Sequence, residues 1–229
     1  MEETPRASEA DAPRLGASPE WGYLLSEFYE MYRNSGAGGS ERIGGHQRAV
    51  REAVGRVLRD DPPVRPQPPE TKPVARHLGR ALDRGALDRA APFIAAIRHV
   101  APLLAWRYGY DRVPKGLAEK FAFAELAGPS GPVVTERVIL GLVLFAPGCT
   151  YPAHAHEGIT ESYYVLAGSV SENHAGVYAA GSMIFNPPGH MHRITVGQRN
   201  PALLAYAWAG PAEALRGQKM VFSRPRRRS

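Results

Sequence analysis

The sequence has almost no cysteine: Cys149 is the only one in 229 residues. One thiol cannot form an intrachain disulfide or a cysteine-rich zinc module, and its scarcity fits a reducing compartment. Long hydrophobic runs are also missing, since no stretch approaches the about 18 apolar residues that span a bilayer. The opening "MEETPRASEADAPRLGASPEW" lacks the apolar segment of a signal peptide. These absences predict a cytoplasmic protein without a membrane partner.

Nucleic-acid recognition motifs are absent as well, although the formal net charge is +6. Part of the excess lies in the final "RPRRRS", and a short terminal arginine run is typical of a solvated chain end. We therefore predict no nucleic-acid partner and assign residues 216–229 to a basic C-terminal tail. Hydrophobic content of 44% and charged content of 22% are those of a globular protein with a sizeable core.

The N-terminal half is predicted to be a helical extension over residues 19–118, after a disordered segment, 1–18, rich in proline, alanine, serine and acidic groups. In "SPEWGYLLSEFYEMYRNSG", Ser18 can cap a helix that has Pro19 in its first turn. An apolar stripe follows at helical spacing, formed by Trp21, Leu24, Leu25, Phe28, Met31 and Tyr32. The stripe indicates packing in the core or against a second copy, so a homodimer is one predicted assembly.

Further helices are expected in "GGSERIGGHQRAVREAVGRVLRDD", "VARHLGRALDRG" and "DRAAPFIAAIRHVAPLLAW". The proline-rich "PPVRPQPPETKP" between the first two must be extended or a loop. His46, His77 and His99 lie on these helical stretches without partners at ligand spacing, and we interpret them as ordinary surface or packing histidines. No convincing helix-turn-helix occurs among these segments, which argues against a transcription regulator.

The pattern changes near residue 120, where short β-rich runs begin. "RVILGLVLFA", "ESYYVLAGSV", "SMIFNPP" and "ALLAYAWAG" are separated by glycine, proline and asparagine turn signals about every ten residues. That spacing is typical of an antiparallel sandwich or barrel. We therefore predict a mainly β fold with an α-helical N-terminal extension, in which a β-barrel spans residues 119–215.

One β-rich stretch, "YPAHAHEGITESYYVLAG", carries several groups that bind cations or move protons. Because alternate side chains of a strand lie on the same face, His154 and His156 should point the same way. Glu161 and Tyr163 should likewise share a face, with Tyr164 on the opposite one. Burying these imidazoles and this carboxylate without partners would cost several kcal/mol, and a bound divalent metal removes that penalty.

A third imidazole follows in "GSMIFNPPGHMHRITV", where His192 heads a strand after a Pro-Pro-Gly turn. Together the two stretches resemble both cupin signatures. The first signature is filled by Gly148, His154, His156, Glu161 and Gly168; the second by Gly181, Pro187, Gly189 and His192. Val196 stands where the second signature usually has asparagine. The signature selects His192 over His190, which we place near the barrel mouth, and His174 lies outside both motifs.

The resemblance to cupins covers roughly residues 135–210. It implies a jelly-roll barrel, also called a double-stranded β-helix, that binds one divalent transition metal ion. The implied ligands are His154, His156, Glu161 and His192. Three imidazoles and one carboxylate suit Fe, Mn, Zn, Co or Ni, and the ligand types do not choose among these metals.

The pattern Glu-x-Tyr-x4-Gly, formed by Glu161, Tyr163 and Gly168, resembles the cupin-type dimethylsulfoniopropionate lyases of marine bacteria. The helical extension followed by "LLAWRYGYDRVP" looks most like the DddL branch of that family. The sequence departs from several related lyases in one respect, since four residues instead of three separate His156 from Glu161.

This resemblance implies that a small zwitterionic substrate, dimethylsulfoniopropionate, undergoes β-elimination to dimethyl sulfide and acrylate. Tyr163 matches the catalytic tyrosine of the family and would be the general base, although a core tyrosine supporting the metal ligands is the alternative. A tyrosine beside a metal can ionise below its ordinary pKa of about 10. Aromatic side chains that could hold the sulfonium group are Tyr206, Trp208, Trp106, Tyr108 and Tyr110.

Two other functions remain open at this stage. An Fe(II) cupin dioxygenase acting on a small organic acid would use the same four ligands, and oxygen uptake would distinguish it from a lyase. A non-catalytic sensor or ligand-binding cupin would use the N-terminal helices as an interaction module instead.

Overall fold

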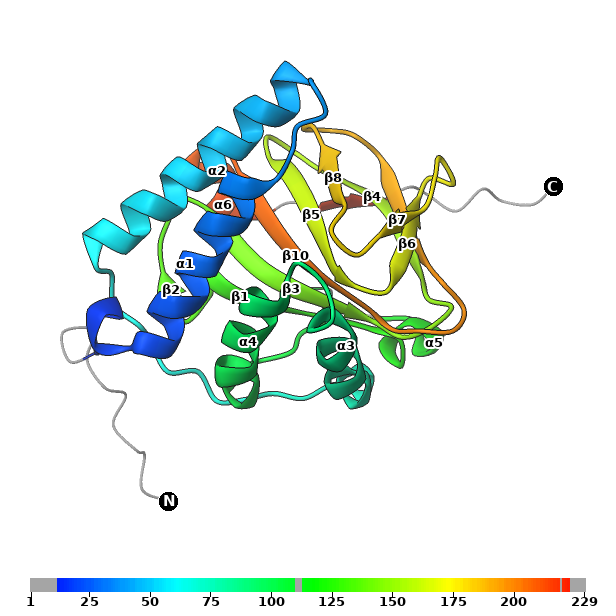
Figure 1. Cartoon of the computed structure of the whole chain (residues 1–229), viewed down its shortest axis with the longest axis horizontal. Helices are drawn as coiled ribbons and strands as arrows, with labels where there is room; N and C mark the ends of the chain where they lie inside the picture. The colour runs from blue at the N-terminus through cyan, green and yellow to red at the C-terminus, as the bar shows by residue number, and fades with distance from the viewer. Residues whose placement is uncertain (1–11, 110–112, 219, 223–229) are drawn as a thin grey trace.

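The computed structural model describes residues 12–109, 113–218 and 220–222. Two β-sheets face each other, and the N-terminal helices cover the outer face of the larger sheet (Figure 1). The mainly β fold with a helical extension therefore agrees with the prediction. Within the described ranges, no helix is both long and apolar enough to cross a membrane.

The larger sheet has six strands in the order β2-β1-β3-β10-β5-β8, and the smaller has five in the order β11-β4-β9-β6-β7. Neighbouring strands are antiparallel, except for β1 and β2, which run parallel. The strands are β1 Phe121–Gly128, β2 Val133–Val134, β3 Ile139–Phe145, β4 Thr150–His156, β5 Thr160–Ala167, β6 Ser169–Glu172, β7 Tyr178–Ala179, β8 Met183–Asn186, β9 His192–Val196, β10 Ala202–Ala209 and β11 Met220–Phe222.

The expected barrel is formed by two separate sheets rather than by one closed hydrogen-bonded ladder within the described residues. The chain changes sheets at tight turns, for example between β5 and β6 at Gly168. Gly168 has φ +81°, and a Cβ there would lie 2.3 Å from the carbonyl oxygen of Pro201. Only glycine fits this turn, which explains why the first cupin signature ends on that residue.

Two hydrophobic cores lie on the two faces of the larger sheet. The alternation along β3 shows the division, because Leu140, Leu142 and Leu144 pack toward the helices. Val143 and Phe145 pack instead between the two sheets. Both faces of β3 are buried, which is why this strand is a continuous apolar run in the sequence.

The helical layer is formed by four longer helices and several single turns. The helices are α1 Pro19–Asn34, α2 Glu41–Asp60, α3 Leu78–Gly85, α4 Ala91–Val100, α5 Lys115–Ala118 and α6 Ala212–Gly217, with 3₁₀ turns at Leu15–Ala17, Pro73–His77 and Ala101–Leu103. The aromatic stripe of α1 faces inward, and Phe28 contacts Phe93 of α4 with ring centroids 4.6 Å apart. Five of the six residues of the stripe are buried, so the stripe is core packing, and the homodimer stays a prediction.

The chain ends differ from the predicted boundaries. Residues 1–11 of the predicted disordered segment lie outside the described residues, but Leu15 is buried and its backbone N–H donates to Pro62. Ser18 precedes α1 as expected, yet its hydroxyl donates to the Arg14 carbonyl instead of capping the helix. A long-range backbone hydrogen bond therefore attaches this part of the N-terminal segment to the fold.

The predicted tail begins inside α6, and the chain then returns to the smaller sheet as β11, which pairs with β4. Gln218 and Met220 line the main cavity between the sheets. The assignment of the whole range 216–229 to a tail is therefore wrong for residues 216–218 and 220–222. Residue 219 and residues 223–229 lie outside the described part of the chain.

Candidate metal centre

The four predicted ligands come together across the gap between the two sheets. His154 and His156 lie on β4 and His192 begins β9, both in the smaller sheet, whereas Glu161 lies on β5 of the larger sheet. His154 and His192 are direct cross-strand partners. One potential ligand atom from each of the four residues lies within 4.8 Å of the others, and every one of these side chains is at most 3% exposed. One ion could therefore contact all four.

Hydrogen bonds to the backbone orient two of the imidazoles. Nδ1 of His154 lies 3.0 Å from the carbonyl oxygen of Pro152, and Nδ1 of His192 lies 3.0 Å from that of His190. A carbonyl oxygen only accepts, so Nδ1 carries the proton in each ring. Nε2 of each ring then keeps its lone pair for a metal ion, the usual outer-shell arrangement of metal-binding histidines.

The remaining donor atoms fit a cation because the protein leaves them without hydrogen bonds. Among the described residues, Nε2 of His156, Nε2 of His192 and Oε2 of Glu161 are buried and make no well-formed hydrogen bond. Oε2 of Glu161 nevertheless lies only 2.9 Å from Nε2 of His192. Buried polar atoms are normally hydrogen-bonded, so a converging set without such bonds fits a bound cation. The imidazole and carboxylate types suit a divalent transition metal.

The electrostatics of the cluster keep His154 neutral and Glu161 ionised, as metal binding requires, but favour a proton on His192. Burial lowers the pKa of His154 to about 4, which keeps that imidazole neutral. Burial opposes ionisation of Glu161, but His156 and His192 outweigh it and hold the pKa of that carboxyl well below its usual value. Burial likewise opposes protonation of His192, and Glu161 nonetheless raises the pKa of that imidazole. A cation bound at the cluster would displace the proton from His192.

Tyr163 lies beside this cluster, on the same face of β5 as Glu161. It is 6% exposed, and its ring centroid is 6.2 Å from that of His192. Burial, followed by the negative charge of Glu161, raises the pKa of Tyr163 well above 10. Tyr164 points to the opposite face, where it packs against the helical core as the alternation predicts.

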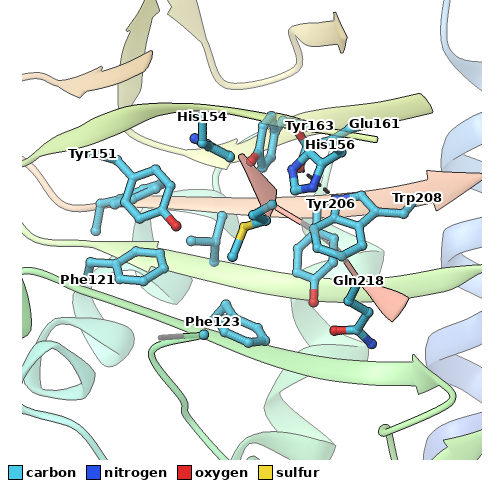
Figure 2. Close-up of a pocket in the computed structure, with 14 residues that line it drawn as sticks. Phe121, Phe123, Tyr151, His154, His156, Glu161, Tyr163, Tyr206, Trp208 and Gln218 are labelled. Carbon is cyan, nitrogen blue, oxygen red and sulfur yellow. Dashed lines mark hydrogen bonds and ion pairs between the residues drawn. The ribbon is translucent and has the colours of Figure 1, made fainter. Parts of the chain in front are cut away.

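A cavity of about 220 Å³ opens in front of His154, His156, Glu161 and Tyr163 (Figure 2). Its walls are strongly aromatic and include Phe121, Phe123, Phe145, Tyr151, Tyr206 and Trp208. Sequence reasoning found only the last two of these. The alternation in "FAFAEL" could have pointed to Phe121 and Phe123, since both lie on one face of β1.

Tyr206 reaches the cavity because the neighbouring strand has no side chain opposite it. Gly141 of β3 is its cross-strand partner. A Cβ at residue 141 would lie 2.3 Å from Cζ of Tyr206. Any larger residue would therefore displace the tyrosine ring, so Gly141 defines this wall of the cavity.

Trp208 lines the cavity as expected, but its polar edge already has a partner. Nε1 of Trp208 donates to Oε1 of Glu161 at 2.7 Å, and its ring lies 4.3 Å from that of His156. The hydrogen bond holds the carboxylate in an orientation in which Oε2 lies beside the imidazole of His192. The indole thus orients a candidate metal ligand, a role that spacing along one strand could not reveal.

Replacing Trp208 with Phe should weaken metal binding about 10- to 100-fold, the usual loss when an outer partner of a ligand is removed. A competition titration with a chromophoric chelator measures the affinity. Trp106→Phe is the matched control, because Trp106 is buried in the helical core and should change only stability. Equal metal affinity in Trp208→Phe and the unchanged protein would show that the hydrogen bond does not matter.

Two of the other predicted aromatic contacts lie elsewhere. Trp106 packs between the helices and the larger sheet, away from the cavity. The hydroxyl of Tyr108 donates to the Ala118 carbonyl, and Nζ of Lys72 lies 4.8 Å from its ring centroid. The ammonium group of Lys72 thus already lies over the face of the Tyr108 ring. Neither Trp106 nor Tyr108 lines the cavity. Tyr110 lies outside the described residues.

The histidines outside the cluster are placed largely as predicted. His190 and His174 are exposed, and His190 stacks on His192 with centroids 6.4 Å apart. His77 and His99 lie in the helical layer without contact to the cluster. His46 is buried and hydrogen-bonded to Ser162. Only the four predicted ligands form a metal-type cluster within the described residues.

Comparison with known proteins identifies the family. A model of the dimethylsulfoniopropionate lyase family matches residues 46–204. The chain is 50% identical over 214 residues to a Cereibacter sphaeroides protein named as a candidate dimethylsulfoniopropionate lyase, DddL, and the match covers 93% of this chain and 92% of that protein.

Solved structures share the fold. The dimethylsulfoniopropionate lyase DddQ from Ruegeria pomeroyi matches with a TM-score of 0.68 at 22% identity, covering 91% of this chain and 98% of that one. A chain from the crystal structures of the lyases RdDddP and RnDddQII matches with a TM-score of 0.65 at 23% identity. The match covers 90% of this chain and 99% of that one. These two matches confirm the predicted cupin fold with its helical extension. Together with the family match and the 50% identity, they lead to one assignment: the chain belongs to the dimethylsulfoniopropionate lyase family.

Proposed function

We propose that the chain is a metal-dependent lyase that cleaves dimethylsulfoniopropionate to dimethyl sulfide and acrylate. One observation carries the proposal: four donor side chains converge, and three of them line the same small aromatic cavity as a buried tyrosine. The family match supports the choice of substrate. Cupins host many reactions, so the residues of the site, rather than the fold, support this function.

In this proposal His154, His156, Glu161 and His192 would hold one divalent ion. The ion would supply Lewis-acid stabilisation of negative charge on the substrate carboxylate. Fe, Mn, Zn, Co and Ni all accept three imidazoles and one carboxylate. The protein would be expressed with each metal supplied in turn and then purified. Elemental analysis of each preparation, together with its rate of turnover, would identify the ion that supports activity.

Tyr163 is the proposed general base. In its tyrosinate form, its phenolate oxygen takes the proton from the α-carbon of the substrate, and the C–H electron pair forms the new C=C bond. The bond from the β-carbon to sulfur breaks with its electrons on sulfur, so dimethyl sulfide leaves as a neutral molecule. Because the charge of Glu161 contributes to the high pKa of Tyr163, a compensating positive charge at the cluster favours the tyrosinate.

The aromatic walls supply a binding place for the sulfonium group. Phe123 and Tyr206 lie on the side of the cavity away from the donor cluster (Figure 2). Aromatic faces attract such cations by about 0.5–2 kcal/mol each. With the carboxylate at the cluster and the sulfonium against these rings, the substrate would lie across the cavity, with its α-carbon between them and near Tyr163.

The experiment is incubation of metal-loaded protein with dimethylsulfoniopropionate, followed by headspace detection of dimethyl sulfide and quantification of acrylate by NMR. We expect equal amounts of both products and no oxygen consumption. Turnover that consumes oxygen would instead favour a dioxygenase. Tight binding without any product would favour a ligand-binding cupin.

A further inference from the structure

Three buried polar side chains meet on the helical side of β5. Oγ of Ser162 lies 2.7 Å from the hydroxyl of Tyr32 on α1 and 2.7 Å from Nε2 of His46 on α2. These residues are separated from Ser162 by 130 and 116 positions in the sequence. Ser162 is fully buried, and Tyr32 and His46 are 2% and 7% exposed. We call these three residues the Tyr32–Ser162–His46 network.

One arrangement of protons satisfies all three groups. Burial lowers the pKa of His46 to about 4, so its imidazole is neutral near pH 7 and Nε2 can accept a hydrogen bond. Tyr32 then donates to Oγ of Ser162, and Ser162 donates to His46. The surrounding interface between helices and sheet is otherwise largely apolar.

The place of Ser162 in the chain gives the network its significance. Ser162 lies between Glu161, a candidate metal ligand, and Tyr163, the candidate base. Because side chains alternate along a strand, the serine faces the helices while its two neighbours face the cavity. Any movement of Ser162 perpendicular to the sheet therefore moves both neighbours.

Backbone pairing does not fix this perpendicular direction. β5 lies between β10 and β8, where Ser162 pairs with Ala207 and Phe185, and these ladders hold the strand within the plane of the sheet. His154 and His192 lie on the opposite sheet. The height of β5 above that sheet thus sets the distance between Glu161 and the imidazoles.

We infer that the Tyr32–Ser162–His46 network positions β5, and that helices α1 and α2 thereby set the geometry of the metal site. Apolar packing tolerates small sliding movements, whereas hydrogen bonds are directional and specify one arrangement. The three residues act as positioning residues, since none of them lines the cavity. The kinetic part of this inference depends on the proposed lyase activity; the spectroscopic part does not.

The test replaces the whole network by apolar side chains, in the triple variant Tyr32→Phe, Ser162→Ala and His46→Leu. Removing every member leaves no unpaired buried polar group, so the thermal unfolding temperature should stay within a few degrees of the unchanged protein. We expect kcat to fall about tenfold with KM within twofold. The visible absorption spectrum of the Co(II)-loaded protein should shift, because it reports ligand geometry.

Val54→Ala is the matched control, because Val54 is a fully buried residue of α2 and belongs to the apolar interface. It should lower the unfolding temperature while the Co(II) spectrum and kcat remain unchanged. The single substitution His46→Gln keeps a polar atom at the network. Its kcat should therefore be close to that of the unchanged protein rather than to that of the triple variant. If the triple variant does not fold, Tyr32→Phe, which removes one hydroxyl, should show the same spectral shift to a smaller extent.

An unchanged Co(II) spectrum in the folded triple variant, or in Tyr32→Phe where the triple variant does not fold, would overturn the inference. So would a kcat within twofold of the unchanged protein. If the unchanged protein releases no dimethyl sulfide, the proposed function fails, and the Co(II) spectra alone then decide whether the network positions β5.

Discussion

Tyr163→Phe should lower dimethyl sulfide release by about 100- to 10,000-fold, the contribution expected of a positioned general base. The substitution removes only the phenolic oxygen, so the ring continues to fill its place beside His192. Neither the imidazoles nor Glu161 is changed, and the content of bound metal should therefore be the same. Headspace analysis and elemental analysis of one preparation measure both quantities.

Tyr206→Phe is the matched control for this prediction. Tyr206 is also a buried tyrosine that lines the cavity, and it is the cross-strand partner of Tyr163. Loss of its hydroxyl should change turnover far less, because the proposed role of Tyr206 uses only the face of its ring. Near-normal turnover in Tyr163→Phe would remove this residue as the base, and equal losses in both variants would indicate a general effect on the cavity.

The faces on which the candidate site residues lie could be predicted because they depend on local periodicity. Two-residue alternation places Glu161 and Tyr163 on one face of β5 and Tyr164 on the other, as the structure shows. The signature glycines are equally local, since Gly148 and Gly168 both have positive φ. His192 could be predicted as a ligand only from the second cupin signature, because nothing in its own segment indicates that it pairs with His154.

Long-range contacts could not be predicted in the same way. Alternation tells which face of a strand a side chain occupies but not which other segment covers that face. Trp106 and Tyr108 are aromatic and close to the barrel in sequence, yet Trp106 joins the helical core and Tyr108 contacts Lys72. Gln218 reaches the cavity only because the chain turns back after α6.

Polar contacts across layers were hidden for the same reason. His46 has no ligand-type neighbour in the sequence, and its partner Ser162 is 116 positions away. The Trp208 indole was expected to meet substrate, but its N–H group reaches Glu161 on the adjacent strand. In each case the missing information is the register between elements, which depends on the packing of the whole domain rather than on any short pattern.

His192→Ala should abolish turnover by releasing the metal. The substitution deletes one of the four donors and leaves Oε2 of Glu161 without the imidazole that lies 2.9 Å away. Metal affinity should fall by more than the about 10- to 100-fold that loss of an outer hydrogen-bond partner causes. Removing the metal from the unchanged protein with a chelator should likewise abolish turnover. Adding the metal back should restore turnover in the unchanged protein but not in His192→Ala.

The pH dependence of the stability of the metal-free protein tests whether His192 acts in the cluster through its charge rather than only through packing. The folded-state pKa of His192 is raised, so its protonated form stabilises the fold below about pH 6.5, and this contribution is lost as the pH rises through the folded value. The folded-state pKa of Glu161 is lowered, so its ionised form stabilises the fold above about pH 4.5. This contribution is lost as the pH falls through the folded value. Unfolding of the metal-free protein should therefore show an extra stabilisation in mildly acidic solution that His192→Ala lacks.

His190→Ala provides the control, because His190 stacks on His192 but is exposed and outside the donor cluster. Its backbone carbonyl, which accepts the hydrogen bond from Nδ1 of His192, is retained in the variant. Metal content and turnover should therefore survive in His190→Ala and disappear in His192→Ala. The opposite ranking would mean that the ion binds nearer the mouth of the fold, and the cluster between the sheets would then lose its assigned role.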